Sequence, residues 1–411
     1  MAATKYKDSG IPWIGDIPSD WEVCRLKNLH TDSNVGESID KSFCSDNPND
    51  TLFYTAGLKP IHTTYLDFPE WKYTQKSNLL LSRNGTPYVY IPIEGAVYSD
   101  HIIRIDINNN CSKEFVRYCL QQAIASEVVD SVSIATWSMS LWDKQILPFP
   151  PLATQQRIAD YLDRKCAEID ELADLQQTMI DELKRYKQSV ITEAVTKGLN
   201  PNVKMKDSGV EWIGEIPEHW EVIRIKNLLN ERKQRSEDGT EEPLSMSQKY
   251  GLIPTKDMDS IPNMASTFVG AKVVYEGDLV FNKLKAHLGV FSVSKYFGLV
   301  SPDYAVYYSK NNSNAKYLEF LFKTPQYINE FKKLSTGVGS GLTRLYTSDL
   351  FGIKAIQPPI QEQGEIMNYI TQKCAEIDEL IAVKQQKIEA LKEYKKSVIF
   401  EYVTGKKEVE K

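Results

Sequence analysis

An internal duplication constrains the fold of this chain more than any other feature. Sixteen of the 23 residues from Lys7 to Leu29 are identical to those 199 positions later, from Lys206 to Leu228. A second block, Lys165 to Leu172, recurs unchanged as Lys373 to Leu380. Matches this dense do not arise by chance. The order of the blocks predicts domain, helix, domain and helix, related by a pseudo-two-fold repeat.

The repeated blocks divide the chain into four segments. Proline interrupts strand ladders and disfavours helix in the residue before it, so the Pro-Pro steps at 150–151 and 358–359 mark boundaries. Residues 152–197 then contain neither Pro nor Gly, which predicts one long helix. The predicted segments are a first domain over 1–150, a helix over 151–200, a second domain over 201–357 and a second helix over 358–411.

Both predicted helices carry a heptad stripe. Residues spaced alternately by three and four run from 162 to 190 and from 370 to 398, which is the spacing of a coiled-coil seam. The large apolar members of the stripe are Leu162, Ile169, Leu172, Leu183, Tyr186, Ile377, Leu380, Leu391 and Tyr394. The second stripe is polar at Lys384 and Lys387, so Val383 and Ile388 are the alternative seam there. We expect an antiparallel coiled coil that acts as a spacer; two helices that each cover their own domain are the alternative.

The regions between the repeated blocks, 30–145 and 229–350, hardly resemble each other. Each alternates short β-rich runs with turn residues, and each holds one helical stretch, near 113–129 and near 313–332. This pattern predicts α+β domains with mainly antiparallel, curved sheets. A shared scaffold with divergent inserts indicates two copies that keep one docking geometry and recognise different things.

One strand end in each domain carries cationic, amide and hydroxyl side chains. Aligning Leu79 with Leu279 places residues 82–86 opposite residues 282–286. Arg and Lys pair with guanine acceptors and Asn pairs bidentately with adenine, so such loops suit the reading of base edges. An ordinary solvated turn is the alternative. The candidates for DNA binding are Arg83, Asn84, Thr86, Asn282, Lys283 and Lys285.

A glycine-rich segment over residues 335–344 is a second candidate for DNA contact. It ends in Arg344, which suits a phosphate or groove contact, and no strand–helix unit surrounds its glycines as a nucleotide-binding loop would require. Its counterpart over residues 131–140 holds Thr136, aligned to within one residue. His101 and His287 are further candidates, against the alternative of structural histidines.

The sequence contains no motif of a catalytic or metal centre. Walker A, H-E-x-x-H and Rossmann patterns are absent, and the five histidines show no metal spacing. Pro302-Asp303 begins like a nuclease motif, but the later Glu-x-Lys, residues 393–395, lies on the predicted helix. Six cysteines without paired short spacings favour reduced thiols in the cytoplasm. No apolar run reaches the roughly 18 residues of a membrane span.

The charge distribution limits how the chain can bind DNA. The net charge is −6, with 13 basic against 18 acidic residues over 1–150 and 20 against 18 over 201–357. Neither domain is strongly basic, as a protein that binds DNA unaided would be. Binding therefore requires a locally basic face and a more basic partner that neutralises most phosphates.

The repeated blocks resemble the specificity subunit of Type I restriction–modification systems. The similarity lies in the Lys-Asp-Ser-Gly-x-x-Trp-Ile-Gly-x-Ile-Pro openings from Lys7 and Lys206, and in the Pro-Pro-(Leu/Ile)-x-x-Gln runs, Pro150 to Gln155 and Pro358 to Gln363. It covers essentially the whole chain. The resemblance implies two target-recognition domains that each read one half of an asymmetric, bipartite site in double-stranded DNA.

The same resemblance implies partners that carry the chemistry. Two methyltransferase subunits would dock along the helices that bear the stripe, and restriction subunits would join the full complex. S-adenosylmethionine, ATP and magnesium are expected on those partners and none on this chain, which would be non-catalytic within an adenine methyltransferase and ATP-dependent endonuclease. The alternative is a coiled-coil scaffold or decoy that binds the methyltransferase without reading DNA.

Overall fold

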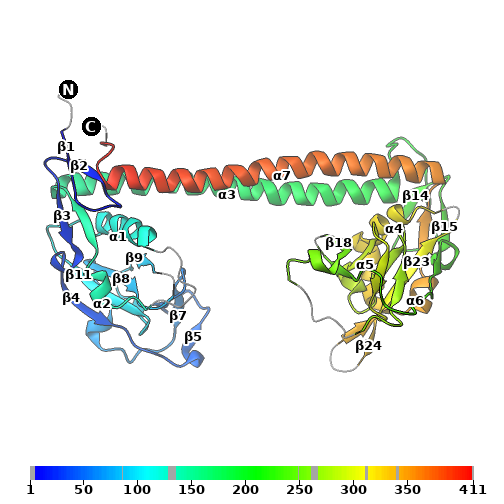
Figure 1. The fold of residues 1–411 in the computed structure, drawn as a ribbon, viewed down its shortest axis with the longest axis horizontal. Helices are drawn as coiled ribbons and strands as arrows, with labels where there is room; N and C mark the ends of the chain where they lie inside the picture. Colours follow the sequence, from blue (N-terminus) through cyan, green and yellow to red (C-terminus); the bar gives the residue numbers. More distant parts are fainter. Residues whose placement is uncertain are drawn as a thin grey trace. The chain divides into compact units, whose positions relative to one another are not determined.

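The computed structural model describes residues 5–85, 87–127, 136–248, 250–260, 267–310, 313–338 and 342–409. The chain forms two compact units (Figure 1). Unit 1 comprises the chain up to Gln177 together with the chain from Gln385 onward, and unit 2 comprises Thr178–Lys384. The two long helices, α3 (Leu152–Lys197) and α7 (Ile360–Val403), therefore each contribute to both units.

Unit 1 is built on a four-stranded antiparallel sheet in the order β4-β11-β8-β9. A second four-stranded sheet has the order β10-β6-β7-β5, and β1–β2 and β3–β12 form two-stranded pairs. The strands are β1 (Tyr6–Asp8), β2 (Asp16–Pro18), β3 (Glu22–Arg25), β4 (His30–Val35), β5 (Cys44–Ser45), β6 (Thr51–Tyr54), β7 (Ile61–Thr63), β8 (Asn78–Ser82), β9 (Val89–Tyr90), β10 (Val97–Tyr98), β11 (Ile102–Ile107) and β12 (Ile146–Phe149). The domain helices are α1 (Lys113–Glu127) and α2 (Met139–Trp142).

Unit 2 repeats the main sheet in the order β16-β23-β20-β21, again antiparallel, and repeats the flanking pairs as β13–β14 and β15–β26. The additional pairs are β17–β18, β19–β22 and β24–β25. The strands are β13 (Met205–Asp207), β14 (Glu215–Pro217), β15 (Glu221–Arg224), β16 (Leu229–Glu231), β17 (Leu244–Ser247), β18 (Gly251–Pro254), β19 (Lys272–Val274), β20 (Leu279–Asn282), β21 (Phe291–Val293), β22 (Gly298–Val300), β23 (Tyr304–Ser309), β24 (Thr336–Val338), β25 (Leu342–Arg344) and β26 (Lys354–Gln357). The domain helices are α4 (Ala315–Phe322), α5 (Pro325–Leu334) and α6 (Thr347–Gly352).

The predicted α+β class with mainly antiparallel sheets is confirmed, with two differences in detail. The helix expected near 313–332 is two helices, because Pro325 cannot continue α4 and instead starts α5. In unit 1, β6 and β10 pair in parallel.

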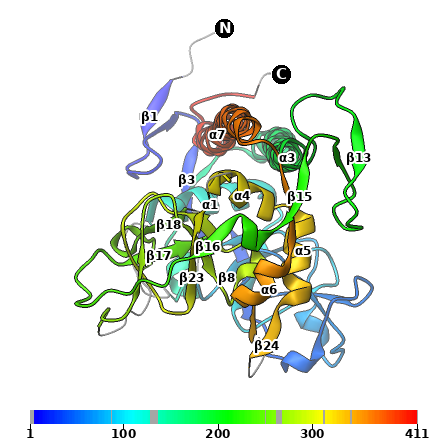
Figure 2. The same cartoon turned by 90° about the vertical axis from the view of Figure 1, so that its right-hand side faces the viewer.

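In unit 2, helix α4 lies between the long helices and the main sheet (Figure 2), and the Tyr317 hydroxyl donates to the Val195 carbonyl of α3 at 2.9 Å. In unit 1 the corresponding α1 packs on α3, where the Tyr118 hydroxyl donates to Asp163 at 2.7 Å.

A buried glutamine fixes the start of each long helix to its domain. Gln155 is fully buried, donates to the Pro150 carbonyl at 2.8 Å and accepts from the Ser112 amide at 2.9 Å. Gln363 repeats both bonds at 2.8 Å, to the Pro358 carbonyl and from the Asn314 amide. The glutamine of the Pro-Pro motif thus ties together the last strand, the helix and the domain helix in both units.

Each long helix ends on a glycine in the left-handed conformation beside a repeated tryptophan. Gly198 has φ +79°, and a Cβ there would lie 3.2 Å from the Trp220 ring. Gly405 has φ +70°, and a Cβ there would lie 3.0 Å from the Trp21 ring. Only glycine allows both this conformation and this approach. In unit 1 the residue Gly405, which follows α7, therefore packs against Trp21 of the first repeated block.

The helices pair antiparallel within each unit, but the predicted stripe is correct at only one of its two heptad positions. Leu162, Ile169 and Gln176 are buried in the seam as predicted, whereas Leu172 and Tyr186 are 48% and 57% exposed. The other seam position lies one residue later, at Cys166, Ala173, Ile180 and Lys187 in α3 and at Cys374, Ile381, Ile388 and Lys395 in α7. Of the other predicted residues, Leu172, Tyr186, Leu380, Lys387 and Tyr394 are exposed beside the seam. Lys165, Met179 and Lys373 are half-buried, and Met179 Sδ lies 3.2 Å from Lys384 Nζ of the other helix. Of the two alternatives, Ile388 is buried and Val383 is exposed.

The error has a simple cause. Spacings of three-then-four and four-then-three share the same seven-residue repeat and cannot be told apart by period. The larger side chains Leu172 and Tyr186 favoured the wrong choice over the small Ala173 and the cationic Lys187. Lys187 and its repeat Lys395 belong at the edge of the seam because each forms an ion pair with the other helix, Lys187 with Asp378 and Lys395 with Asp170, both at 2.6 Å.

The glutamine anchor predicts a stability loss in unit 1. Gln155→Leu keeps the side-chain volume but leaves the Pro150 carbonyl and the Ser112 amide buried without partners, which should lower the free energy of unfolding by about 1–3 kcal/mol. Urea denaturation measures the change. The neighbouring Gln156 is exposed, so Gln156→Leu is the matched control and should change stability by less than about 0.5 kcal/mol. Equal effects of the two variants would contradict the anchoring role.

The corrected seam predicts unequal costs along one helix. Leu162→Ala removes a fully buried side chain and should destabilise the protein by about 2–5 kcal/mol. Leu172→Ala removes a half-exposed one and should cost less than about 1 kcal/mol. Thermal unfolding of the two variants decides between the registers, because the original stripe requires similar losses at both positions.

Candidate nucleic-acid interface

In unit 1 the end of β8 and the start of β11 form a rigid frame for exposed polar side chains. Ser82 pairs with Ile102 in the sheet, and beyond this pair the Arg83 amide donates to the His101 carbonyl at 2.7 Å. The Trp137 amide then donates to the Arg83 carbonyl at 2.7 Å. The frame is anchored in the core because Trp137 lies 4.9 Å, ring to ring, from the fully buried Trp142.

Four of the predicted DNA-binding residues meet on this frame. Arg83, His101 and Thr136 are exposed and Asn84 is half-buried. The Asn84 amide nitrogen lies 2.8 Å from His101 Nδ1. Asn84 also forms a backbone bridge with Thr136. Thr86 lies outside the described residues. The four side chains form what we term the first strand-end cluster.

Unit 2 builds the same frame from different residues. Asn282 pairs with Tyr304 in the sheet, and the Leu345 amide donates to the Lys283 carbonyl at 3.0 Å, as Trp137 does to Arg83. The turns before the two central strands also agree, since His101 and Asp303 each donate their amide to the hydroxyl of a serine two residues earlier at 3.3 Å. These bonds align Arg83 with Lys283, Asn84 with Leu284, His101 with Asp303 and Thr136 with Arg344.

The side chains of the second strand-end cluster, defined as Lys283, Leu284, Asp303 and Arg344, differ from the first at every position. Arg344 Nη2 lies 2.8 Å from Asp303 Oδ1, and Lys285 extends from the turn as an exposed cation. His287 Nδ1 lies 3.4 Å from the Thr343 hydroxyl on the hairpin strand β25. The Asn282 amide oxygen accepts from the Leu284 amide at 3.1 Å, so part of that side chain is engaged in the turn.

Two residues of these surfaces were missed from the sequence. Asp303 was considered only as part of a failed nuclease motif, although its place one residue before a strand matches that of His101.

Lys272, the second of these residues, is 7% exposed and donates to the Tyr304 carbonyl at 2.7 Å. Burial, and next the nearby Lys283, lower the pKa of the Lys272 ammonium. Burial also lowers the pKa of Lys72 in unit 1, which donates to the Val35 carbonyl. No sequence signal distinguishes such buried lysines from surface ones.

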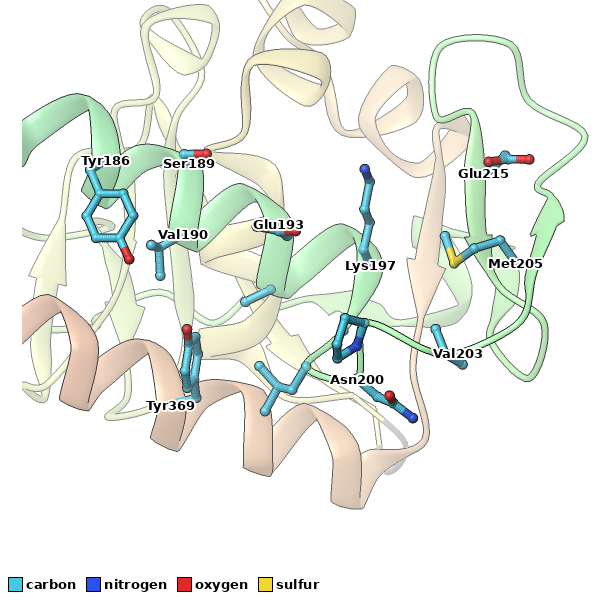
Figure 3. A pocket seen from close by; sticks show the side chains of 14 residues that line it. Tyr186, Ser189, Val190, Glu193, Lys197, Asn200, Val203, Met205, Glu215 and Tyr369 are labelled. Atoms are coloured by element: carbon cyan, nitrogen blue, oxygen red, sulfur yellow. The ribbon is translucent and has the colours of Figure 1, made fainter. Parts of the chain in front are cut away.

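The described residues contain no group of three or more metal-binding side chains, and none of their helices is long and apolar enough to cross a membrane. A hollow of 540 Å³ in unit 2 runs along the last turns of α3, where Tyr186 and Tyr369 point toward one another (Figure 3). In unit 1, Tyr402 takes the place of Ala194, and its ring centroid lies 4.4 Å from that of Tyr161, with the rings inclined at 38°.

Comparison with known proteins agrees with this geometry. The family model of the Type I restriction modification DNA specificity domain matches residues 18–185. The putative type I restriction enzyme MjaX specificity subunit of Methanocaldococcus jannaschii is 28% identical over 434 residues, covering 96% of this chain and 95% of that protein. Among solved structures, a chain from work on complex assembly and conformational transition of the type I R-M system has a TM-score of 0.66 at 14% identity, covering 94% of this chain and 98% of its own. The HsdS subunit of Thermoanaerobacter tengcongensis has a TM-score of 0.52 at 15% identity, covering 95% and 98%.

Fold and strand-end geometry together define a class of protein in which one duplicated scaffold carries two clusters of unlike polar side chains. Within that class, the chain carries a match to the Type I restriction modification DNA specificity domain over residues 18–185 and is similar along nearly its whole length to specificity subunits of Type I restriction–modification systems. The resemblance inferred from the repeated blocks is confirmed.

Proposed function

We propose that this chain reads an asymmetric, bipartite DNA site, with each unit recognising one half. The observation that carries the proposal is the pair of strand-end clusters, which share one hydrogen-bonded frame and differ in all four side chains. Base readout needs side chains held on a rigid scaffold, and a change of side chain on an unchanged scaffold changes the sequence that is read. The paired helices set the spacing between the half-sites.

We also propose that the partner subunits supply the chemistry and most of the phosphate contacts. Two methyltransferase subunits would bring S-adenosylmethionine, and restriction subunits would bring ATP and magnesium, so that the complex acts as an adenine methyltransferase and ATP-dependent endonuclease in the cytoplasm. The chain's net charge of −6 is compatible with this division because phosphate neutralisation dominates affinity while base contacts provide specificity. All six cysteines are free, which suits a reducing compartment.

The residues beside the helix seam are the best candidates for methyltransferase docking. Of the stripe members, Leu162, Ile169 and Ile377 are buried and unavailable, whereas Leu172 and Tyr394 in unit 1 and Tyr186 and Leu380 in unit 2 are about half exposed. Leu172 and Leu380 occupy one position of the repeat, and Tyr186 and Tyr394 occupy another. Each unit therefore exposes one leucine and one tyrosine. Tyrosine and leucine exposed in matching places provide apolar anchors for two copies of one partner.

A domain exchange tests the reading of DNA. Replacing residues 206–350 with those of another specificity subunit should change one half of the methylated motif and leave the other half intact. Sequencing of methylated DNA, with and without the gene, measures this. A chain that only scaffolds the methyltransferase would leave the motif unchanged, and a change in both halves would contradict the modular assignment.

A matched pair of double variants tests the docking surface. Leu172→Asp with Leu380→Asp places charge on both copies of the apolar position and should weaken methyltransferase binding at least tenfold, while thermal unfolding stays near that of the wild type because both side chains are half exposed. Ala167→Asp with Ala375→Asp places the same charges at exposed positions five residues earlier on the same two helices. Titration calorimetry should show wild-type affinity for this control; equal losses in both double variants would argue against the stripe as the contact.

A further inference from the structure

Arg344 and Asp303 form an ion pair within the second strand-end cluster. Arg344 Nη2 and Asp303 Oδ1 lie 2.8 Å apart, and the Asp303 side chain is 60% exposed while that of Arg344 is 24% exposed. Arg344 lies on β25, whose hairpin with β24 is on the side of unit 2 away from its long helices (Figures 1 and 2). The pair joins this hairpin to the turn before β23.

The guanidinium of Arg344 keeps donors that no described residue engages. Nε is buried and has no hydrogen-bond partner among the described residues, while Nη2 uses one of its two N–H groups on Asp303. The remaining donors at the outer end are Nη1 and the second N–H of Nη2. Two parallel donors in this geometry match the O6 and N7 acceptors on the major-groove edge of guanine.

The carboxylate of Asp303 decides which kind of DNA group suits this arginine. A phosphate carries negative charge and would be repelled by an exposed carboxylate beside the guanidinium. The edge of guanine is neutral and presents acceptors only, so it gains the two hydrogen bonds without that repulsion. Thr136, at the equivalent place in unit 1, offers only a hydroxyl.

We propose that Asp303 is a positioning residue that holds Arg344 in the orientation to read one guanine in the half-site recognised by unit 2. The inference rests on the proposed DNA-reading function and adds to it the base, the residue that reads it and the residue that orients the reader. Arg344 contacts the base, and Asp303 acts through Arg344.

The test uses the full chain assembled with the methyltransferase subunits of its own system, and a library of methylation sites randomised in both halves. Arg344→Ala should abolish the preference for guanine at one base pair of the half-site that the 206–350 exchange alters, a loss of discrimination of about tenfold or more. Arg344→Lys should weaken the same preference without abolishing it, because the ammonium keeps the charge beside Asp303 and can still donate to guanine but loses the planar fork that makes two parallel hydrogen bonds. Asp303→Asn should relax the preference at that same base pair, and Asp303→Asn with Arg344→Ala should be no worse than Arg344→Ala alone.

Asp32→Asn is the matched control. Asp32 is 59% exposed and forms an ion pair of 2.6 Å with Arg104 in unit 1, so the variant makes the same chemical change outside the second cluster and should leave this base preference intact. Thermal unfolding of each complex separates a lost fold from a lost base preference, and Arg344→Lys remains informative if Asp303→Asn unfolds.

Three results would overturn the inference. One is an unchanged motif in Arg344→Lys and Asp303→Asn. Another is a uniform fall in affinity for all sequences, with the salt dependence reduced by about one charge, which would make Arg344 a phosphate contact. The third is a relaxed base preference in Arg344→Ala but an unaltered one in folded Asp303→Asn, which would limit Asp303 to a structural role. A wild-type complex that methylates no chain-dependent motif would instead defeat the proposed function itself.

Discussion

The pairing of α3 with α7 is the interaction on which both units depend. In unit 1, Val398, Ile399 and Val403 of α7 belong to the same buried core as Ile158 and Leu162 of α3. In unit 2, Ile191 and Val195 from the end of α3 share a core with Ile366 and Ile370 from the start of α7. Each unit therefore completes its core with chain that is distant in sequence, and neither long helix belongs to one unit alone.

The residues that repeat in sequence are those that serve this assembly. Gln155 and Gln363 make the same two hydrogen bonds at the helix starts. Trp21 and Trp220 pack against the glycines that follow the two helices, Gly405 and Gly198. The ion pairs of Lys187 and Lys395 with the opposite helix are repeated as well. Exposed ion pairs of this kind contribute little free energy, about 0–1 kcal/mol, so their role is to favour one register. The positions that differ include the strand ends, whose side chains are exposed or half-buried.

Prediction from the sequence succeeded where period and neighbouring residues decide the outcome. The helix starts, the strand ends at Ser82 and Asn282 and the alignment of Arg83 with Lys283 follow from local pattern. It failed where packing decides. The period of the stripe could not choose between Leu172 and Ala173, and the break between α4 and α5 at Pro325 was overlooked within a helical stretch. Asp303 could not be linked to Arg344, because a separation of 41 residues is closed only by the sheet and the β24–β25 hairpin.

The sequence by itself determined the duplication, the α+β class, the two long helices and the absence of a recognisable catalytic motif, because each of these is written in repeats, periods and residue types. The tertiary structure decided which heptad positions face the partner helix and which side chains meet at the strand ends. Those outcomes depend on distances between residues far apart in the chain. A local sequence pattern does not reveal these distances, because they are set only when the sheets fold and the helices pair.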